Sequence, residues 1–257
     1  MIQQNIPVVH LGTSPDQSSG VVTRSIMDDE IKGIQIESIT LASGNVVTDE
    51  IREDSKAIYL FLSGDGAALI NRSEYPISPE TILLPNSEQK LTIENSSSDP
   101  LLYVKILCHL SDDDQSDMRS FPAEHTQQVY HARFDDCQAY TEPIKSPNTI
   151  SRTILPNKII PRVAMGTVQT TGPDAVGAHK HPMLDQLFLG LSDNQCTVHA
   201  DGVSQIFGEY DLLHIPLGST HSVEVAEQAT MYYIWMDFFL HIDGEEWLDT
   251  HIVDEES

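Results

Sequence analysis

The chain repeats itself at an interval close to half its own length. Residues 58–66, which read IYLFLSGDG, align with residues 187–195, which read LFLGLSDNQ, at an offset of 129 residues. Residues 80–85 (ETILLP) align with residues 211–216 (DLLHIP) at an offset of 131 residues. A repeat of this length in a chain of 257 residues predicts two copies of one domain in tandem.

The local pattern in both halves is that of β strands. Short runs rich in β-branched and aromatic residues alternate with clusters of Gly, Pro, Asn, Asp and Ser, as in an all-β barrel or sandwich. The clearest expected strands are 34–41, 58–62, 67–70, 81–84, 101–107, 163–168, 187–191, 212–215 and 231–239.

The strand pattern weakens between Leu110 and Asn148. An acidic stretch at 111–117 is followed by a stretch at 142–148 that contains two prolines, which discourage regular structure. We therefore expect an N-terminal barrel at 1–120, a linker region at 121–150 and a C-terminal barrel at 151–257.

Composition excludes several classes of partner. The formal net charge is −25, with 39 acidic against 14 basic residues, which is the wrong sign for binding nucleic acid or an anionic membrane. The first residues, MIQQNIPVVHLG, lack the basic and apolar regions of a signal peptide, and no apolar run approaches the ~18 residues of a membrane span. The three widely spaced cysteines form neither a disulfide framework nor a zinc-finger pattern. We expect a cytoplasmic protein with no nucleic-acid or membrane partner.

Three histidines in the second half have the spacing of a metal site. His179 and His181 are two residues apart, so on an extended strand both side chains point to the same face. Pro216-Leu-Gly218 predicts a turn that would bring His221 in from another strand. Three imidazoles with an oxygen donor suit one divalent transition metal (Mn, Fe, Co, Ni, Cu or Zn) better than Mg or Ca.

These residues resemble the two motifs of the cupin superfamily. The first motif has two histidines separated by one residue and, after three or four more residues, a glutamate; the second reads PxGxxH. His179-x-His181 and the segment from Pro216 to His221 match, in order and at about the expected separation. The resemblance covers residues 163–239 well and 34–108 more faintly, and it implies two tandem jelly-roll barrels with a metal site in the second.

One departure from the family pattern concerns the fourth ligand. Where the family usually has Glu, this chain has Gln186, preceded by Asp185. Strand alternation favours Gln186 as the inward-facing ligand, which would donate a neutral carbonyl oxygen. Two alternatives stay open: Asp185 points inward instead, or both residues face solvent and water completes the shell.

The first half lacks the same residues. The two offsets carry the four ligand positions back to Glu50, Arg52, Ala57 and Lys90, which do not make a transition-metal site. We interpret the N-terminal barrel as a degenerate partner without a metal.

The resemblance implies a function in outline. We expect a metal-dependent enzyme of isomerase, hydrolase or lyase type that acts on a small polar metabolite, as ureidoglycine aminohydrolase-like and 5-deoxyglucuronate isomerase-like bicupins do. A quercetinase-like dioxygenase and a non-catalytic cupin that binds a small ligand are the alternatives. The catalytic residues are not identified; Asp185, Tyr232 and His214 are candidates for a general base. Cupin-like barrels commonly associate through their sheets, so we expect a homodimer.

Overall fold

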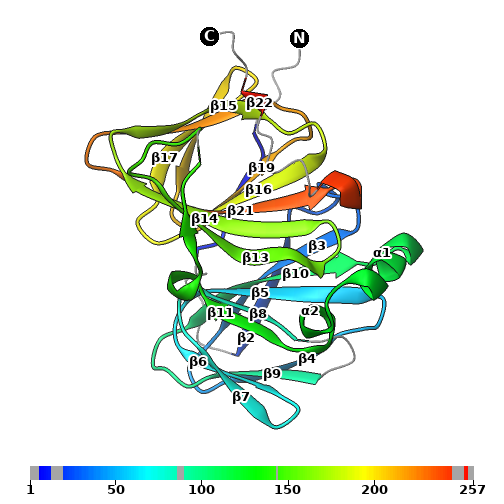
Figure 1. The fold of residues 1–257 in the computed structure, drawn as a ribbon. Coiled ribbons are helices and arrows are strands. Elements are labelled where there is room, and N and C mark those ends of the chain that lie inside the picture. The colour runs from blue at the N-terminus through cyan, green and yellow to red at the C-terminus, as the bar shows by residue number, and fades with distance from the viewer. Residues whose placement is uncertain (1–5, 13–19, 86–89, 143, 245–251, 254–257) are drawn as a thin grey trace. The chain divides into compact units, whose positions relative to one another are not determined.

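The computed structural model describes residues 6–12, 20–85, 90–142, 144–244 and 252–253. Its strands fall into four sheets, two in each of two compact units (Figure 1). The chain is therefore all-β, as expected. Eight of the nine strands expected from the sequence lie within an observed strand. The other one, expected at 187–191, lies in a strand that ends one residue earlier, at Gly190.

The C-terminal barrel is the unit formed by the described residues of 1–11, 137–157 and 162–257. Its smaller sheet has the order β18-β17-β20-β15-β22, with bounds Val203–Gly208, Gln195–Ala200, His221–Val225, Asp174–Lys180 and Ile252–Val253. Its larger sheet has the order β1-β19-β16-β21-β14-β13-β12, with bounds Val8–His10, Asp211–Ile215, Leu184–Gly190, Thr230–Phe239, Val163–Thr171, Ile150–Ile160 and Ala139–Tyr140.

The N-terminal barrel is the unit formed by the described residues of 12–136 together with 158–161. Its smaller sheet has the order β4-β9-β6-β7, with bounds Val46–Glu50, Lys90–Asn95, Gly66–Ile70 and Ser73–Ile77. Its larger sheet has the order β11-β8-β5-β10-β3-β2, with bounds Tyr130–Arg133, Thr81–Leu84, Ser55–Ser63, Leu101–His109, Ile34–Leu41 and Val21–Ile26. The helices α1 (Asp112–Asp117) and α2 (Ala123–Gln127) and two short 3-10 turns at 118–120 and 134–136 follow β10.

The observed grouping differs from the expected division: residues 121–136 and 158–161 go with the N-terminal barrel, and two further segments go with the C-terminal barrel. The first described residues go with the C-terminal barrel, because β1 pairs with β19 at its sheet edge. Residues 137–150, expected in the linker region, also belong to that barrel, since Tyr140 pairs with Ser151 and Lys145 forms a bridge with Val176.

The two barrels have the same strand order. Apart from β12 and β22, each strand of one barrel has a counterpart at the same place in a sheet of the other. The paired hairpins β6–β7 and β17–β18 both turn over two residues with positive φ, Asn71-Arg72 and Asp201-Gly202, a conformation that matches the twist of the strands. The internal repeat therefore corresponds to a duplicated fold.

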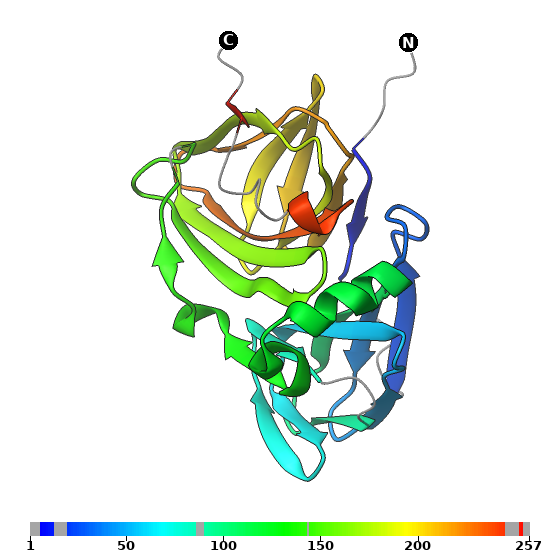
Figure 2. The same cartoon turned by 45° about the vertical axis from the view of Figure 1, so that its right-hand side comes forward.

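The hydrophobic pattern explains where each core lies. The larger sheets contain continuous apolar runs, such as Ala57–Leu62 in β5, which are buried on both faces. The smaller sheets alternate; in β20 the inward-facing Val223 and Val225 are buried and Glu224 is exposed. Each barrel thus encloses one apolar core between its two sheets, and the strands of the C-terminal barrel wrap around a common interior in the turned view (Figure 2).

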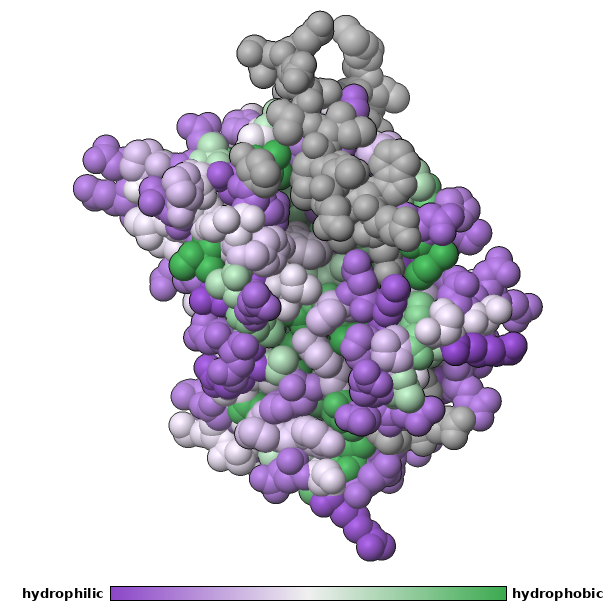
Figure 3. All heavy atoms as spheres, viewed as in Figure 1, coloured by the Kyte–Doolittle hydropathy of each residue, from purple (hydrophilic) through white to green (hydrophobic). Residues whose placement is uncertain are grey.

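The exterior that Figure 3 shows is mostly hydrophilic. On the face of the molecule shown in Figure 3, hydrophilic residues predominate and hydrophobic ones are scattered. Among the described residues, no helix has the length and apolar character needed to cross a membrane.

Candidate metal centre

The three predicted histidines come together at one end of the C-terminal barrel. His179 lies on β15 and faces His221, the first residue of β20, in the strand register; His181 follows directly after β15. One ring nitrogen from each of the three lies within 4.8 Å of the others. Gly218 has a φ of +75°, which permits the turn between Pro216 and His221. The residues of both sequence motifs therefore converge as expected.

Backbone hydrogen bonds orient two of the rings. His179 Nδ1 donates to the carbonyl oxygen of Gly177 at 2.7 Å, and His221 Nδ1 donates to that of Ser219 at 3.2 Å. A histidine whose Nδ1–H is bonded in this way presents Nε2 as the atom that can bind a metal.

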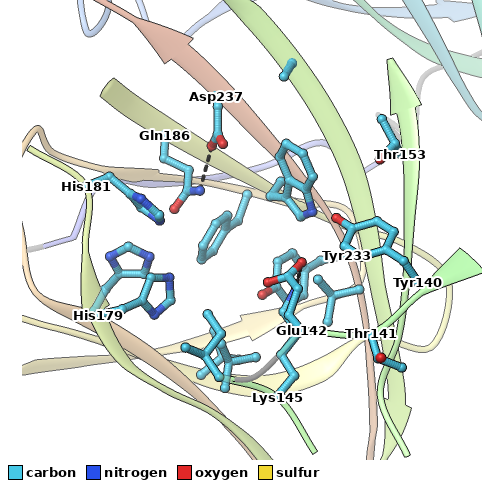
Figure 4. A pocket seen from close by; sticks show the side chains of 18 of the residues that line it. Tyr140, Thr141, Glu142, Lys145, Thr153, His179, His181, Gln186, Tyr233 and Asp237 are labelled. Carbon is cyan, nitrogen blue, oxygen red and sulfur yellow. Dashed lines mark hydrogen bonds and ion pairs between the residues drawn. The ribbon is translucent and has the colours of Figure 1, made fainter. Parts of the chain in front are cut away.

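Gln186 lies beside the histidines, inside the barrel. Its Nε2 donates to Asp237 Oδ1 at 2.6 Å, and the two residues face each other across β16 and β21. Its Oε1 is buried and accepts no hydrogen bond from any residue that the structure describes. The bond to Asp237 holds the amide so that this oxygen points to the side of His179 and His181 (Figure 4).

Asp185 is on the opposite face of the same strand. Its Oδ1 accepts a hydrogen bond from the backbone N–H of Leu217 at 3.1 Å and lies 3.5 Å from Nε2 of His214. Neither Asp185 nor His214 lines the cavity next to the three histidines, and Tyr232 does not line it either. Of the two neighbouring candidates for the fourth ligand, the one that faces this cavity is Gln186.

The histidines and Gln186 form one side of a cavity of about 490 Å³ inside the C-terminal barrel, a typical size for a small-ligand site. An apolar and aromatic surface lies between them and a polar wall. The polar wall comes from residues 140–157, and its hydrogen-bonding side chains are Tyr140, Thr141, Glu142, Lys145, Thr153 and Asn157.

Burial shifts the pKa values of several groups in this cavity. It raises the pKa of the Asp237 carboxyl to about 7, although the hydrogen bond from Gln186 and the charge of Lys145 act in the opposite direction. Burial lowers the pKa of the Lys145 ammonium, and Glu142 opposes that shift. It also raises the pKa of the Tyr140 and Tyr233 hydroxyls. Groups with shifted pKa values that gather in one cavity are typical of a functional site.

Sequence reasoning missed Asp237 and the polar wall. A signal for Asp237 existed: it is the only charged residue in the apolar strand MYYIWMDFF, two and four positions from Trp235 and Tyr233, which also line the cavity. No comparable signal marked Glu142 and Lys145, because they precede β13 in a stretch without strand periodicity.

The corresponding positions of the N-terminal barrel hold different chemistry. Glu50 faces Lys90 in the register of β4 and β9, just as His179 faces His221 in that of β15 and β20. Ala57 is buried, and Glu50, Arg52 and Lys90 are exposed. The two offsets read from the sequence thus identify structurally equivalent residues.

The comparisons with known proteins concern the fold. No family model and no curated protein matches the sequence. A cupin 2 conserved barrel domain protein from Leptotrichia buccalis is similar in structure, with a TM-score of 0.63, 19% identity and coverage of 93% of this chain and 99% of that chain. A putative glyoxylate induced protein from Pseudomonas aeruginosa has a TM-score of 0.73 and 9% identity, with coverage of 92% of this chain and 90% of that chain. An oxalate decarboxylase variant from Bacillus subtilis has a TM-score of 0.64 and 11% identity, with coverage of 92% of this chain and 79% of that chain. The chain therefore has the jelly-roll cupin fold.

The residues present fit a divalent transition metal. A metal about 2.1 Å from each imidazole nitrogen requires those nitrogens to lie about 3–4 Å apart, which small side-chain movements achieve from the observed cluster. The buried Oε1 of Gln186 would supply an oxygen donor, and within the described part of the chain no group donates a hydrogen bond to it. Asp237 accepts a hydrogen bond from the amide of Gln186, the kind of contact that would orient a metal ligand.

Proposed function

We propose that the C-terminal barrel binds one divalent transition metal through His179, His181, His221 and Gln186. The observation that carries this proposal is the convergence of three histidine nitrogens within 4.8 Å in a cavity that also contains an unsatisfied buried amide oxygen. The Gln186 oxygen requires a partner, because a buried polar atom without a hydrogen bond is destabilising.

We further propose that the protein is an enzyme of isomerase, hydrolase or lyase type acting on a small polar metabolite. A bound metal would supply Lewis-acid chemistry by polarising an oxygen of the ligand. The chain itself contributes a cavity with ionisable groups, Glu142 and Lys145, on the wall away from the histidines (Figure 4). One structural neighbour, oxalate decarboxylase, is an enzyme named for a small carboxylate substrate, but a shared fold does not fix a function.

The metal content of tag-free protein tests this proposal, with His179→Ala/His221→Ala as the control. We expect about one metal per chain in the wild type and none in the double variant. Redox-inert Zn, or Mn without oxygen consumption, would support Lewis-acid chemistry, whereas Mn, Fe or Cu accompanied by oxygen consumption would favour the dioxygenase alternative. A wild type that contains no metal and takes up none of Mn, Fe, Ni or Zn would exclude both kinds of enzyme and leave a cupin that only binds a ligand.

The homodimer expected from the sequence stays a prediction. Light scattering on the full chain would test it.

A further inference from the structure

The polar wall of the cavity contains a buried ion pair that the metal site does not use. Lys145 Nζ donates to Glu142 Oε1 at 2.8 Å and to Ser151 Oγ at 3.0 Å. The Lys145 side chain is 6% exposed and that of Glu142 is 14% exposed. The Tyr140 hydroxyl is also hydrogen-bonded to Glu142, so the carboxylate is held from two sides.

Stability alone is a poor explanation for this ion pair. Removing two charges from water is costly, and well-packed apolar residues of similar size are often as stabilising as a buried pair. Here the pair lines a cavity that has apolar surface beside it, from Val168, Val176 and Val223. A ligand that hydrogen-bonds to both charged groups would account for their position.

The chemistry of the pair limits what that ligand group can be. Ionised Glu142 only accepts hydrogen bonds, and protonated Lys145 only donates them. A second carboxylate placed there would be repelled by Glu142, and an ammonium group would be repelled by Lys145. A hydroxyl group both donates and accepts, and it is uncharged, so it suits both neighbours. The hydroxyls of Thr141 and Thr153 and the amide of Asn157 on the same wall add partners for further hydroxyls.

The opposite end of the cavity favours an anion. Three histidines and a glutamine are neutral ligands, so among the described residues Asp237, behind Gln186, is the carboxylate next to the site that would balance the charge of a divalent metal. A carboxylate of the ligand would supply the missing negative charge and an oxygen donor. Figure 4 shows His179 and His181 on one side of the cavity and Glu142, Lys145 and Tyr140 on the other.

We propose that the cavity takes a small hydroxylated carboxylate, of the hydroxy-acid or sugar-acid class. Its carboxylate lies at the histidine cluster and its hydroxyls bond to Glu142 and Lys145, while Tyr233 and Trp235 pack against its carbon chain. The placement of the carboxylate rests on the proposed metal site, whereas the hydroxyl contacts with the polar wall do not.

The test compares two probes on the full chain by calorimetry, with and without added metal. D-gluconate and hexanoate have the same carbon chain and one carboxylate each, but only gluconate carries hydroxyls. We expect the metal-loaded wild type to bind gluconate at least about tenfold more tightly than hexanoate. Glu142→Gln and Lys145→Met should each remove about tenfold of gluconate affinity and leave hexanoate affinity unchanged. Glu74→Gln, an exposed carboxylate in the N-terminal barrel, is the matched control and should change neither.

The outcomes separate this inference from the proposed function. Equal affinity for the two probes, or no gluconate binding by metal-loaded protein, would overturn the ligand class while the metal site stands. If the chain takes up no metal, the proposed function fails, and gluconate binding by the metal-free chain tests the polar wall. Weaker binding in Glu142→Gln would support the hydroxyl contacts, and unchanged or absent binding would overturn them. If Lys145→Met does not fold, Glu142→Gln carries the test, because its amide has the size of the carboxyl it replaces.

Discussion

The two barrels share one strand order but differ at the positions where a cupin would hold a metal. Where the C-terminal barrel pairs His179 with His221, the N-terminal barrel pairs Glu50 with Lys90. Behind these pairs, Gln186 faces Asp237 in one barrel, whereas Ala57 faces Leu107 in the other. The two barrels therefore share their strand order and the pairing at these positions, and they differ there in the side chains that a metal site would require.

The difference extends to the interior next to the site. In the C-terminal barrel Gly166 faces Trp235, which lines the cavity. The equivalent pair in the N-terminal barrel is Glu37 and Lys105, and Lys105 Nζ lies 2.5 Å from Asp49 Oδ2, which also accepts a hydrogen bond from Tyr59. In the N-terminal barrel these polar groups thus bond to one another, whereas in the C-terminal barrel the amide oxygen of Gln186 lies at the cavity without a hydrogen bond from the described residues.

The largest predicted effect tests whether the histidines alone separate the two barrels. His179→Ala/His221→Ala should lower metal affinity by at least about a hundredfold, because it removes two ligands. Glu50→Ala/Lys90→Ala changes the equivalent pair and should leave metal affinity unchanged. Calorimetric titration with Mn or Zn measures both, and a loss of affinity in the second variant would contradict the assignment.

The next prediction replaces Asp237 of β21 with the residue at the equivalent position of β10 in the N-terminal barrel. Asp237→Leu, which copies Leu107, should lower metal affinity about 10- to 100-fold, because the amide of Gln186 loses the acceptor that orients it. Asp237→Asn keeps an acceptor and should lose less. The same titration measures these affinities, and wild-type affinity in Asp237→Leu would show that Gln186 needs no such support.

How much of this could be read from the sequence depends on the residue. The convergence of the histidines was predictable, because a spacing of two residues places His179 and His181 on one face of a strand and Pro216 and Gly218 predict the turn before His221. The internal repeat predicted the duplicated fold. Strand alternation correctly favoured Gln186 over Asp185 as the residue that faces the cavity. Glu142 and Lys145 were not predictable, because the path of residues 137–150 over the C-terminal barrel depends on tertiary pairings with β13 and β15. The association of β1 with β19, more than 200 residues away, was hidden for the same reason.

A third prediction concerns pH and the metal-free protein. Burial raises the pKa of Asp237 to about 7 in the folded state, above its ordinary value of 3.8. Its contribution to folding is therefore complete below about pH 4 and is lost as the pH rises through about 7. Relative to Asp237→Asn, the free energy of unfolding of the wild type should fall by on the order of 3 kcal/mol over this range. Urea unfolding of both proteins from pH 4 to 8 measures this difference. If the free energies of unfolding of the two proteins change in parallel with pH, the raised pKa of Asp237 is contradicted.

The smallest predicted effect concerns the packing that makes room for Trp235. In Gly166→Ala the new Cβ would lie 2.3 Å from Trp235 Cζ2 and 2.5 Å from the carbonyl oxygen of Arg152. We expect the free energy of unfolding to fall by about 1–3 kcal/mol, measured by urea unfolding. Gly177→Ala is the control: its Cβ would lie at an ordinary 3.5 Å from the carbonyl oxygen of Ile144 and should change stability far less. Equal effects of the two substitutions would show that Trp235 is not tightly packed there.

The most direct test of the contrast between the barrels is an anomalous-scattering map from crystals of the metal-loaded protein. We predict one metal peak per chain, bonded to one nitrogen each of His179, His181 and His221 and to Oε1 of Gln186, with no peak near Glu50 and Lys90. A peak in the N-terminal barrel, or a metal in the C-terminal barrel that is not bound by these histidines, would contradict the account.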